Sequence, residues 1–126
     1  MYLDVDVLLA LIKERDFHKP YAERILAFNE DKYTSVISLL ELEIVIKREM
    51  SDILSMDILS HTLKIIPSLK IISCDQKIFD QSLALRRNYS LGIFDSVHAA
   101  TALACDKRIA STDNAYKRIH SLTLVV

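Results

Sequence analysis

The stretch IFDSVHAATALACDKRIAS, residues 93–111, decides the class of fold. Its first part, Ile93 to Ala104, is rich in alanine and strongly favours a helix. Its last part, Ile109 to Ser111, is a short run that is typical of a strand. A helix that alternates with strands implies parallel pairing and right-handed crossovers. The stretch therefore predicts an α/β fold, and the rest of the chain can be tested against it.

The same alternation continues along the chain. Further strands are predicted at Tyr2-Leu3, Tyr33 to Val36, Leu69 to Ile72 and Leu122 to Val126. Helices are predicted around Val7 to Ile12, around Tyr21 and ending near Asn29, from Ser38 to about Met50, from Ile53 to a stop at Pro67, after the N-cap Asp75, and from Asn114 to Ile119. We therefore expect a central parallel sheet of four to five strands that is flanked by helices.

Composition limits the class of protein. The 126 residues suit one domain, residues 1–126, and 51% hydrophobic with 26% charged residues excludes disorder. We expect no secretion signal at the start and no membrane-spanning segment. The two cysteines, Cys74 and Cys105, lie in apolar surroundings. They predict inert buried thiols in a reducing cytoplasm rather than a disulfide framework.

Glycine and charge limit the chemistry. Gly92 is the only glycine, which excludes glycine-rich phosphate loops, so any phosphate must be held by side chains or a metal ion. Residues 1–63 carry seven Lys/Arg and twelve Asp/Glu, net −5, and residues 64–126 carry nine and five, net +4. This asymmetry permits an anionic partner on one side. The basic pairs in the positive half are candidates for substrate binding, with a solvated surface as the alternative: Arg86, Arg87, Lys107, Arg108, Lys117 and Arg118.

Four carboxylates lie beside predicted strands. Asp4 follows the first strand, Asp113 follows the fourth, Glu41 lies one turn into the helix after the second, and Asp95 lies in the first turn of the alanine-rich helix. Sites in open parallel sheets lie at the carboxyl ends of the strands, so the four could converge. Their repulsion would raise their pKa values unless a divalent cation were bound. Oxygen ligands select Mg²⁺ or Mn²⁺ over zinc.

Each carboxylate except Asp4 also has a simple structural interpretation. Ser38 and Glu41 have the spacing of a capping box. Asp95 is favoured near a helix start by the helix dipole, and Asp113 could cap the helix after it. Asp4 follows an apolar strand, where an unpaired buried charge costs several kcal/mol. The joint occurrence of the four residues beside strands is the signal.

The sequence resembles PIN domains over essentially its whole length. The resemblance lies in four motifs that fall in the family's order: Leu3 to Leu9, Thr34 to Glu41, Phe94 to Leu103, and Ala110 to Tyr116. The third motif, FDSVHAATAL, is the most distinctive. The resemblance implies a three-layer α/β/α domain and a Mg²⁺- or Mn²⁺-dependent endoribonuclease. Small prokaryotic members of this length are typically toxins of the virulence-associated protein C type. They commonly form homodimers and are inhibited by a cognate antitoxin.

The resemblance also assigns residues. It implies Asp4, Glu41, Asp95 and Asp113 as the catalytic and metal-binding cluster. Ser111 matches the hydroxyl residue that the family favours two positions before the last aspartate, and would orient Asp113 or contact phosphate. Tyr116 matches the favoured aromatic residue three positions after it. Asp6 departs from the family, which usually has Asn, Ser or Thr there, and its carboxylate could join the metal shell or lie outside it.

Other residues are less informative. His98, three residues after Asp95, is predicted to be a hydrogen-bonded core histidine, with a ligand or proton donor as the alternative. His61 is predicted to lie at the surface. The apolar run Ile53 to Ile66, together with Leu39, Leu42, Ile44 and Val45, could form a surface for a dimer or an antitoxin, or ordinary core.

Two other functions compete. Asp4-Val5-Asp6-Val7 fits the start of haloacid dehalogenase-type phosphatases, but no glycine-bearing turn follows, a paired acidic motif after the later strand is missing, and the chain is short for that fold plus a cap. The second alternative is a non-catalytic RNA-binding or regulatory scaffold with the same fold.

Overall fold

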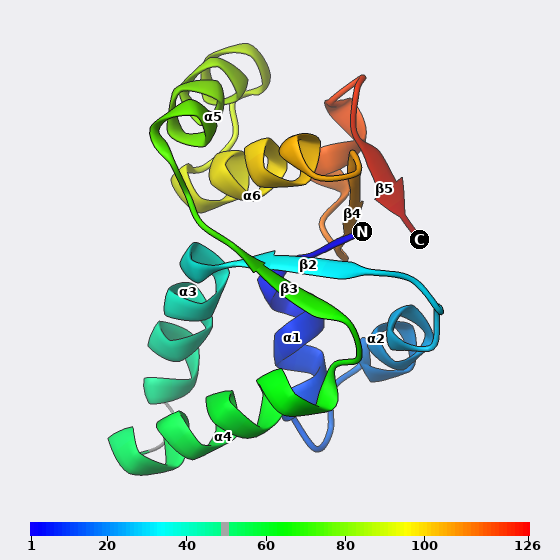
Figure 1. Cartoon of the computed structure of the whole chain (residues 1–126), viewed down its shortest axis with the longest axis vertical. Coiled ribbons are helices and arrows are strands. Elements are labelled where there is room, and N and C mark those ends of the chain that lie inside the picture. The colour runs from blue at the N-terminus through cyan, green and yellow to red at the C-terminus, as the bar shows by residue number, and fades with distance from the viewer. Residues whose placement is uncertain (49–50) are drawn as a thin grey trace.

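The computed structural model describes residues 1–48 and 51–126, and shows a parallel sheet between two groups of helices (Figure 1). The elements in chain order are β1 (Tyr2–Leu3), α1 (Val5–Ile12), α2 (Lys19–Leu26), β2 (Lys32–Ser35), α3 (Val36–Lys47), α4 (Asp52–Ile65), β3 (Leu69–Ile72), α5 (Gln76–Tyr89), α6 (Ile93–Ala104), β4 (Arg108–Ala110), the 3₁₀ helix η1 (Asn114–Arg118) and β5 (Thr123–Val125).

The five strands lie in the order β3-β2-β1-β4-β5, and every pair is parallel. The shortest strand, β1, lies in the middle: Tyr2 pairs with Tyr33 of β2 on one side and with Ile109 of β4 on the other. The chain leaves β1 toward β2 and returns to it through β4, so the strand order reverses at β1. The carboxyl ends of β1 and β4 are therefore the place where a parallel sheet commonly forms a binding site.

The two faces of the sheet have separate cores. Successive strand residues point to opposite faces, so Leu3 packs among α1 to α4, whereas Tyr2 packs against α5 and α6. Figure 1 shows α5 and α6 on one side of the sheet and α1 to α4 on the other. This confirms the predicted three-layer α/β/α arrangement with five strands.

Most element boundaries lie within one or two residues of the prediction. Val36, which was expected to be in a strand, begins α3, because the Ser35 side chain accepts a hydrogen bond from the Ser38 backbone N–H and caps the helix. The second helix ends at Leu26 rather than near Asn29. The strand expected at residues 109–111 covers Arg108–Ala110. The expected end of α3 near Met50 lies outside the described residues.

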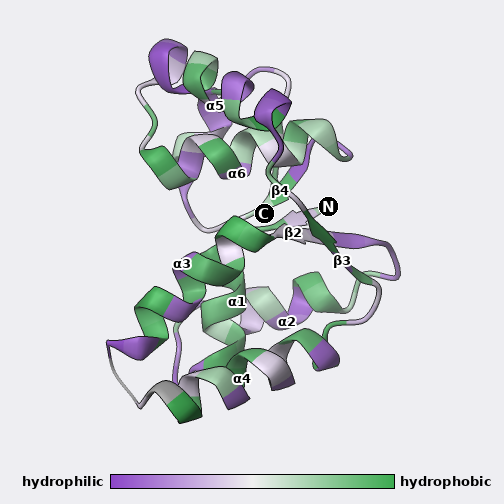
Figure 2. Cartoon of the chain, turned by 60° about the vertical axis from the view of Figure 1, so that its left-hand side comes forward, coloured by the Kyte–Doolittle hydropathy of each residue, from purple (hydrophilic) through white to green (hydrophobic). Residues whose placement is uncertain are grey.

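Apolar side chains remain exposed along α3 and α4. Figure 2 shows hydrophobic segments on both helices. On α3, Val36, Leu40 and Ile44 are spaced four residues apart and each is about half exposed, at 44%, 51% and 50%. On α4, the exposed apolar residues are Ile53, Leu54, Met56 and Ile65. The expected surface therefore exists in part, but Leu42, which was included in it, is completely buried in the core.

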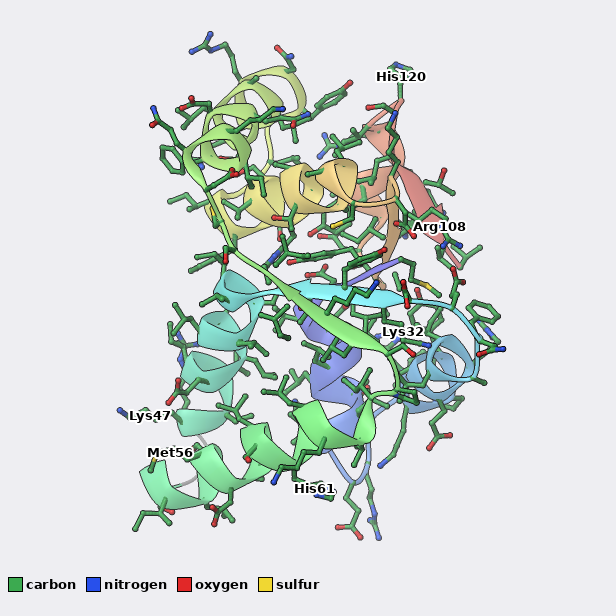
Figure 3. All side chains as sticks on the ribbon, viewed as in Figure 1. Lys32, Lys47, Met56, His61, Arg108 and His120 are labelled. Carbon is green, nitrogen blue, oxygen red and sulfur yellow. The ribbon has the colours of Figure 1, made fainter. Side chains whose placement is uncertain are left out.

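The structure also places the histidine predicted at the surface and the two cysteines. His61 is exposed on α4, as expected (Figure 3). Cys74 and Cys105 are free thiols, but they are half-buried rather than buried. Burial, followed by the charge of a neighbouring aspartate, raises the pKa of both thiols, so the reactive thiolate is disfavoured. Over the part of the chain that the structure describes, no helix is long and apolar enough to cross a membrane.

Candidate functional site

Asp4 lies at the centre of the site, where β1 ends and α1 begins. Its Oδ1 accepts a hydrogen bond from the Val5 N–H at 2.8 Å and caps α1, and its Oδ2 accepts one from the Ser111 hydroxyl at 2.8 Å. The residue is only 7% exposed. Burial raises the pKa of Asp4 to about 6, and the nearby charge of Asp6 adds to this increase. Asp4 is therefore the buried acid that the sequence predicted, and its two hydrogen bonds compensate its negative charge only in part.

Asp6 is hydrogen-bonded to the loop that follows β4. Its Oδ2 accepts hydrogen bonds from the Thr112 N–H at 2.6 Å, from the Thr112 hydroxyl, and from the Ser111 hydroxyl at 3.2 Å. Its Oδ1 is buried and has no hydrogen-bond partner in the part of the chain that the structure describes. One carboxylate oxygen of this additional acid is therefore occupied by the loop, and the other is free to accept.

Asp113 and Asp95 approach each other from separate elements. Asp113 is exposed and caps η1, with its Oδ1 2.8 Å from the Ala115 N, and its own N–H donates to the Ser111 hydroxyl at 3.0 Å. Asp95 lies half-buried in the first turn of α6. Its pKa is raised by burial first, and then by the negative charges of Asp113 and Glu41. These mutual effects place the three carboxylates in one electrostatic environment.

Tyr116 lies close to two of these acids, Asp4 and Asp95. It is completely buried, and its hydroxyl has no hydrogen-bond partner among the described residues. Its pKa is raised, mainly by burial and next by the charges of Asp4 and Asp95. Tyr116, the aromatic residue that matches the family motif, therefore places a neutral hydroxyl beside Asp4 and Asp95.

Glu41 binds a histidine and does not belong to a capping box. The cap of α3 is Ser35, so the predicted Ser38–Glu41 box is wrong. The Glu41 Oε2 instead accepts a hydrogen bond from Nε2 of His98 at 2.7 Å. His98 is 1% exposed and hydrogen-bonded at both ring nitrogens, which confirms that it is a core histidine. The contact of His98 with Glu41 was not predicted from the sequence. Nor was the hydrogen bond between Nδ1 of His98 and the Tyr2 hydroxyl.

The donor set fits a hard divalent cation. Among residues 1–48 and 51–126, no three His, Cys, Asp or Glu side chains come together as a ready-formed metal site. The four acids at the strand ends nevertheless offer only carboxylate oxygens, which Mg²⁺ and Mn²⁺ prefer. The described residues offer the Asp6 Oδ1 no hydrogen-bond partner, and burial together with neighbouring negative charges raises the pKa of Asp4 and Asp95. A cation would offset this repulsion.

Of the six basic residues proposed for substrate binding, two already have protein partners and four are exposed. Arg108 forms ion pairs with Glu30 and Asp106 near β5 (Figure 3). The Nε of Arg86 donates to the Ser96 hydroxyl at 3.2 Å, and its buried Nη2 has no partner within residues 1–48 and 51–126. The other four are exposed: Arg87, Lys107, Lys117 and Arg118.

A cavity of about 260 Å³ adjoins the site and was not anticipated. Ser111 and Thr112 line it on the side of the acids, and Tyr21, Arg24 and His18 line it on the side of α2. The Arg24 guanidinium lies 5.4 Å from the centre of the Tyr21 ring. Sequence reasoning missed this cationic group because it lies in the acidic half of the chain.

Comparisons with known proteins identify the family and the fold. The model of the PIN domain family matches residues 1–122. No curated protein sequence matches the chain significantly.

Solved structures with a similar fold include three toxin or toxin–antitoxin proteins. VapBC2 from Rickettsia felis, bound to a DNA fragment of its promoter, has a TM-score of 0.77 and 22% identity over 98% of this chain and 96% of that chain. A toxin–antitoxin complex from Klebsiella pneumoniae has a TM-score of 0.75 and 22% identity, over 99% and 95%. VapC20 from Mycobacterium tuberculosis, a toxin that cleaves the sarcin–ricin loop, has a TM-score of 0.78 and 14% identity over 94% of each chain.

Proposed function

Because this chain belongs to the PIN domain family, we propose that it is a metal-dependent endoribonuclease and the toxin of a toxin–antitoxin pair. One observation carries the proposal: a single atom, Nε2 of His98, lies 3.9 Å from the buried Asp4 carboxylate and 2.7 Å from Glu41, and the pKa of Asp95 responds to the charges of Asp113 and Glu41. The similar VapC20 toxin, which cleaves the sarcin–ricin loop, supports a nuclease of RNA.

The residues have distinct proposed roles. Asp4 and Asp95 would bind Mg²⁺ or Mn²⁺ directly, and Asp113 and Glu41 would bind through water, bind a second ion, or accept the proton of the attacking water. Such an ion supplies Lewis-acid stabilisation of the phosphate and lowers the pKa of water. Ser111 fixes one oxygen of Asp4 and the backbone of Asp113 at the same time.

RNA would approach over the open edge of the acidic cluster. Arg24 and His18, in the neighbouring cavity, would contact a phosphate next to the one that is cleaved. The exposed residues Arg87, Lys107, Lys117 and Arg118 remain candidates for more distant phosphates, which would add affinity without sequence specificity. Arg86 and Arg108, proposed from the sequence for the same role, already have protein partners.

The apolar residues of α3 and α4 would provide the protein interfaces. Val36, Leu40 and Ile44 offer a helical stripe that suits a second copy of the chain. A cavity of about 370 Å³ between α1 and α4, lined by Leu11, Ile12, Ile58 and other residues, suits an apolar segment of an antitoxin. Several structurally similar proteins are toxin–antitoxin complexes, which supports this assignment.

The haloacid dehalogenase alternative loses support. Its mechanism requires the second aspartate, here Asp6, as an acid or base, but Oδ2 of Asp6 is occupied by three hydrogen bonds from the loop after β4.

The proposal can be tested with a mixed pool of structured RNAs, incubated with the protein in Mg²⁺, in Mn²⁺ or in excess chelator. We expect cleavage in the two metal ions and none in chelator. Cleavage that persists in chelator would overturn the metal-dependent mechanism. Metal binding without cleavage of any RNA in the pool would favour the scaffold, and a phosphorylated Asp4 after incubation with phosphate esters would favour the phosphatase.

A further inference from the structure

A chain of buried hydrogen bonds runs from the centre of the sheet to Glu41. The Tyr2 hydroxyl lies 2.8 Å from Nδ1 of His98, and Nε2 on the other side of the ring lies 2.7 Å from the Glu41 Oε2. Two serines of the β2–α3 junction complete the chain: Ser35 and Ser38 lie 2.9 Å and 2.6 Å from the Tyr2 oxygen. Tyr2, the two serines and His98 are all essentially inaccessible to solvent.

The hydrogens in this chain have a defined direction. A carboxylate can only accept, so Nε2 of His98 carries a hydrogen and donates it to Glu41 whether the ring is neutral or charged. In the neutral ring Nδ1 must then accept, and the Tyr2 hydroxyl is its nearest donor at 2.8 Å. The serine hydroxyls can donate to the Tyr2 oxygen in turn. Every member of the chain is thereby satisfied, and its last donor faces Glu41.

We propose that His98 is a positioning residue of the active site, which holds the Glu41 carboxylate toward Asp4 and Asp95 while Tyr2 and Ser38 hold the ring. This inference rests on the proposed function, because it assumes that Glu41 serves the metal centre. It assigns to the buried histidine the role of an outer partner that orients a ligand or base.

The geometry distinguishes this role from simple core packing. The same Nε2 lies 3.9 Å from Oδ1 of Asp4, so a single N–H edge of the ring faces two acids of the site. The Glu41 side chain is 26% exposed, whereas that of His98 is 1% exposed. Without the histidine, Glu41 is free to turn toward solvent, and a packed apolar residue at position 98 would not prevent this.

The test uses two amide substitutions that place a donor at different positions. His98→Gln puts an amide near the position of Nε2, and His98→Asn puts one near Nδ1. The affinity for Mn²⁺ is measured by calorimetry in the wild type and in both variants, each alone and combined with Glu41→Gln. Thr101→Ala is the matched control, because Thr101 is equally buried on α6 and its hydroxyl donates to the Val97 carbonyl of the same helix. Urea unfolding of each variant separates loss of fold from loss of affinity.

We expect His98→Asn to weaken Mn²⁺ binding by about 10–100-fold, the usual effect of losing an outer partner of a metal ligand. His98→Gln should stay within a few-fold of the wild type, and Thr101→Ala should equal it. Combined with Glu41→Gln, His98→Asn should cause no further loss, because its effect passes through Glu41. Equal losses in the Gln and Asn variants, or an undiminished loss in the Glu41→Gln background, would overturn the inference.

Glu41→Gln alone and Asp95→Asn, measured in the same way, separate failure of the inference from failure of the proposed function. If Glu41→Gln binds Mn²⁺ like the wild type while Asp95→Asn does not, the metal site stands and the role of His98 is refuted. If Asp95→Asn also binds like the wild type, the proposed metal centre itself is refuted.

Discussion

The hydroxyl of Ser111 lies 2.8 Å from Oδ2 of Asp4 and connects the carboxyl ends of β1 and β4. This contact follows from the register, in which Leu3 pairs with Ala110 and the Asp4 N–H donates to the Ala110 carbonyl at 3.1 Å. The same hydroxyl accepts the Asp113 N–H at 3.0 Å. One small side chain thus fixes the relative positions of two acids that come from opposite ends of the sequence.

Replacing Ser111 by Ala should therefore weaken both the fold and the site. The buried Asp4 oxygen loses its donor, which should cost about 1–3 kcal/mol of unfolding free energy. RNA cleavage should fall as well, because Asp4 and Asp113 are no longer held together. Urea unfolding and cleavage rates measure the two effects. Thr62→Ala is the control: Thr62 is buried on α4 and bonds only to the Ile58 carbonyl, so its loss should not change the cleavage rate.

The metal-free protein should lose stability as the pH rises from 3.8 to about 6, the interval between the unfolded and folded pKa values of Asp4. Burial raises the pKa of Asp4 from 3.8 to about 6, so between these values the folded protein binds more protons than the unfolded chain, and the unfolding free energy falls as the pH rises. The decrease from Asp4 amounts to at most about 3 kcal/mol.

His98 extends the same trend to higher pH. Burial lowers its pKa, but the hydrogen bond to Glu41 and the charges of Asp4, Glu41 and Asp95 outweigh burial and raise it. The stabilisation by charged His98 is therefore lost as the pH rises above about 6.5. Urea unfolding in chelator at several pH values tests both groups. Asp4→Asn should flatten the curve below pH 6 and stabilise the metal-free protein at pH 7, and an unchanged curve in this variant would contradict the assignment to Asp4.

Asp6 should matter more for stability than for catalysis. Its Oδ2 accepts the hydrogen bonds of the Thr112 N–H and hydroxyl, so Asp6→Ala should cost about 1–3 kcal/mol by leaving these two donors unpaired. Asp6→Asn keeps one oxygen for the loop and should retain cleavage within about tenfold, about 1.4 kcal/mol in barrier height. A loss as large as that of Asp4→Asn would instead place the free Oδ1 of Asp6 among the metal ligands.

Arg24 should contribute to RNA affinity through charge. If its guanidinium contacts a phosphate from the cavity beside Ser111, Arg24→Ala should reduce the slope of log affinity against log salt by about 0.7 for single-stranded RNA. Arg108→Ala should leave the slope unchanged and should reduce stability, because Arg108 is already paired with Glu30 and Asp106. Binding is measured with Asp95→Asn protein, which should bind RNA without cutting it.

The sequence predicted the parts of the fold that depend on local pattern. The bounds of α6 and β3 agree with the expected Ile93 to Ala104 and Leu69 to Ile72, because alanine content and a short apolar run are local signals. The start of α3 was wrong because Ser35 and Ser38 are both plausible caps. Ser35 takes the role because its backbone, at φ −121° and ψ 161°, is still extended.

The long-range contacts of the site could not be predicted in this way. Ser111 was expected to orient Asp113 or to contact phosphate, and its hydrogen bond to Asp4 was not predicted. The contact between Tyr2 and His98 spans 96 residues, and it depends on which face of the short β1 meets α6. Nor could pattern show that the ion pairs of Arg108 with Glu30 and Asp106 engage a side chain expected to meet RNA.

The most direct test of the central claim, that acids from four elements form one metal-dependent centre, is the rate of RNA cleavage by Asp95→Asn in Mn²⁺. Asp80→Asn, on an exposed position of α5, is the matched control. We expect Asp95→Asn to fold like the wild type and to cleave more than about a hundredfold more slowly, since loss of an outer partner alone costs 10–100-fold. Asp80→Asn should be fully active. Full activity in Asp95→Asn would contradict the account.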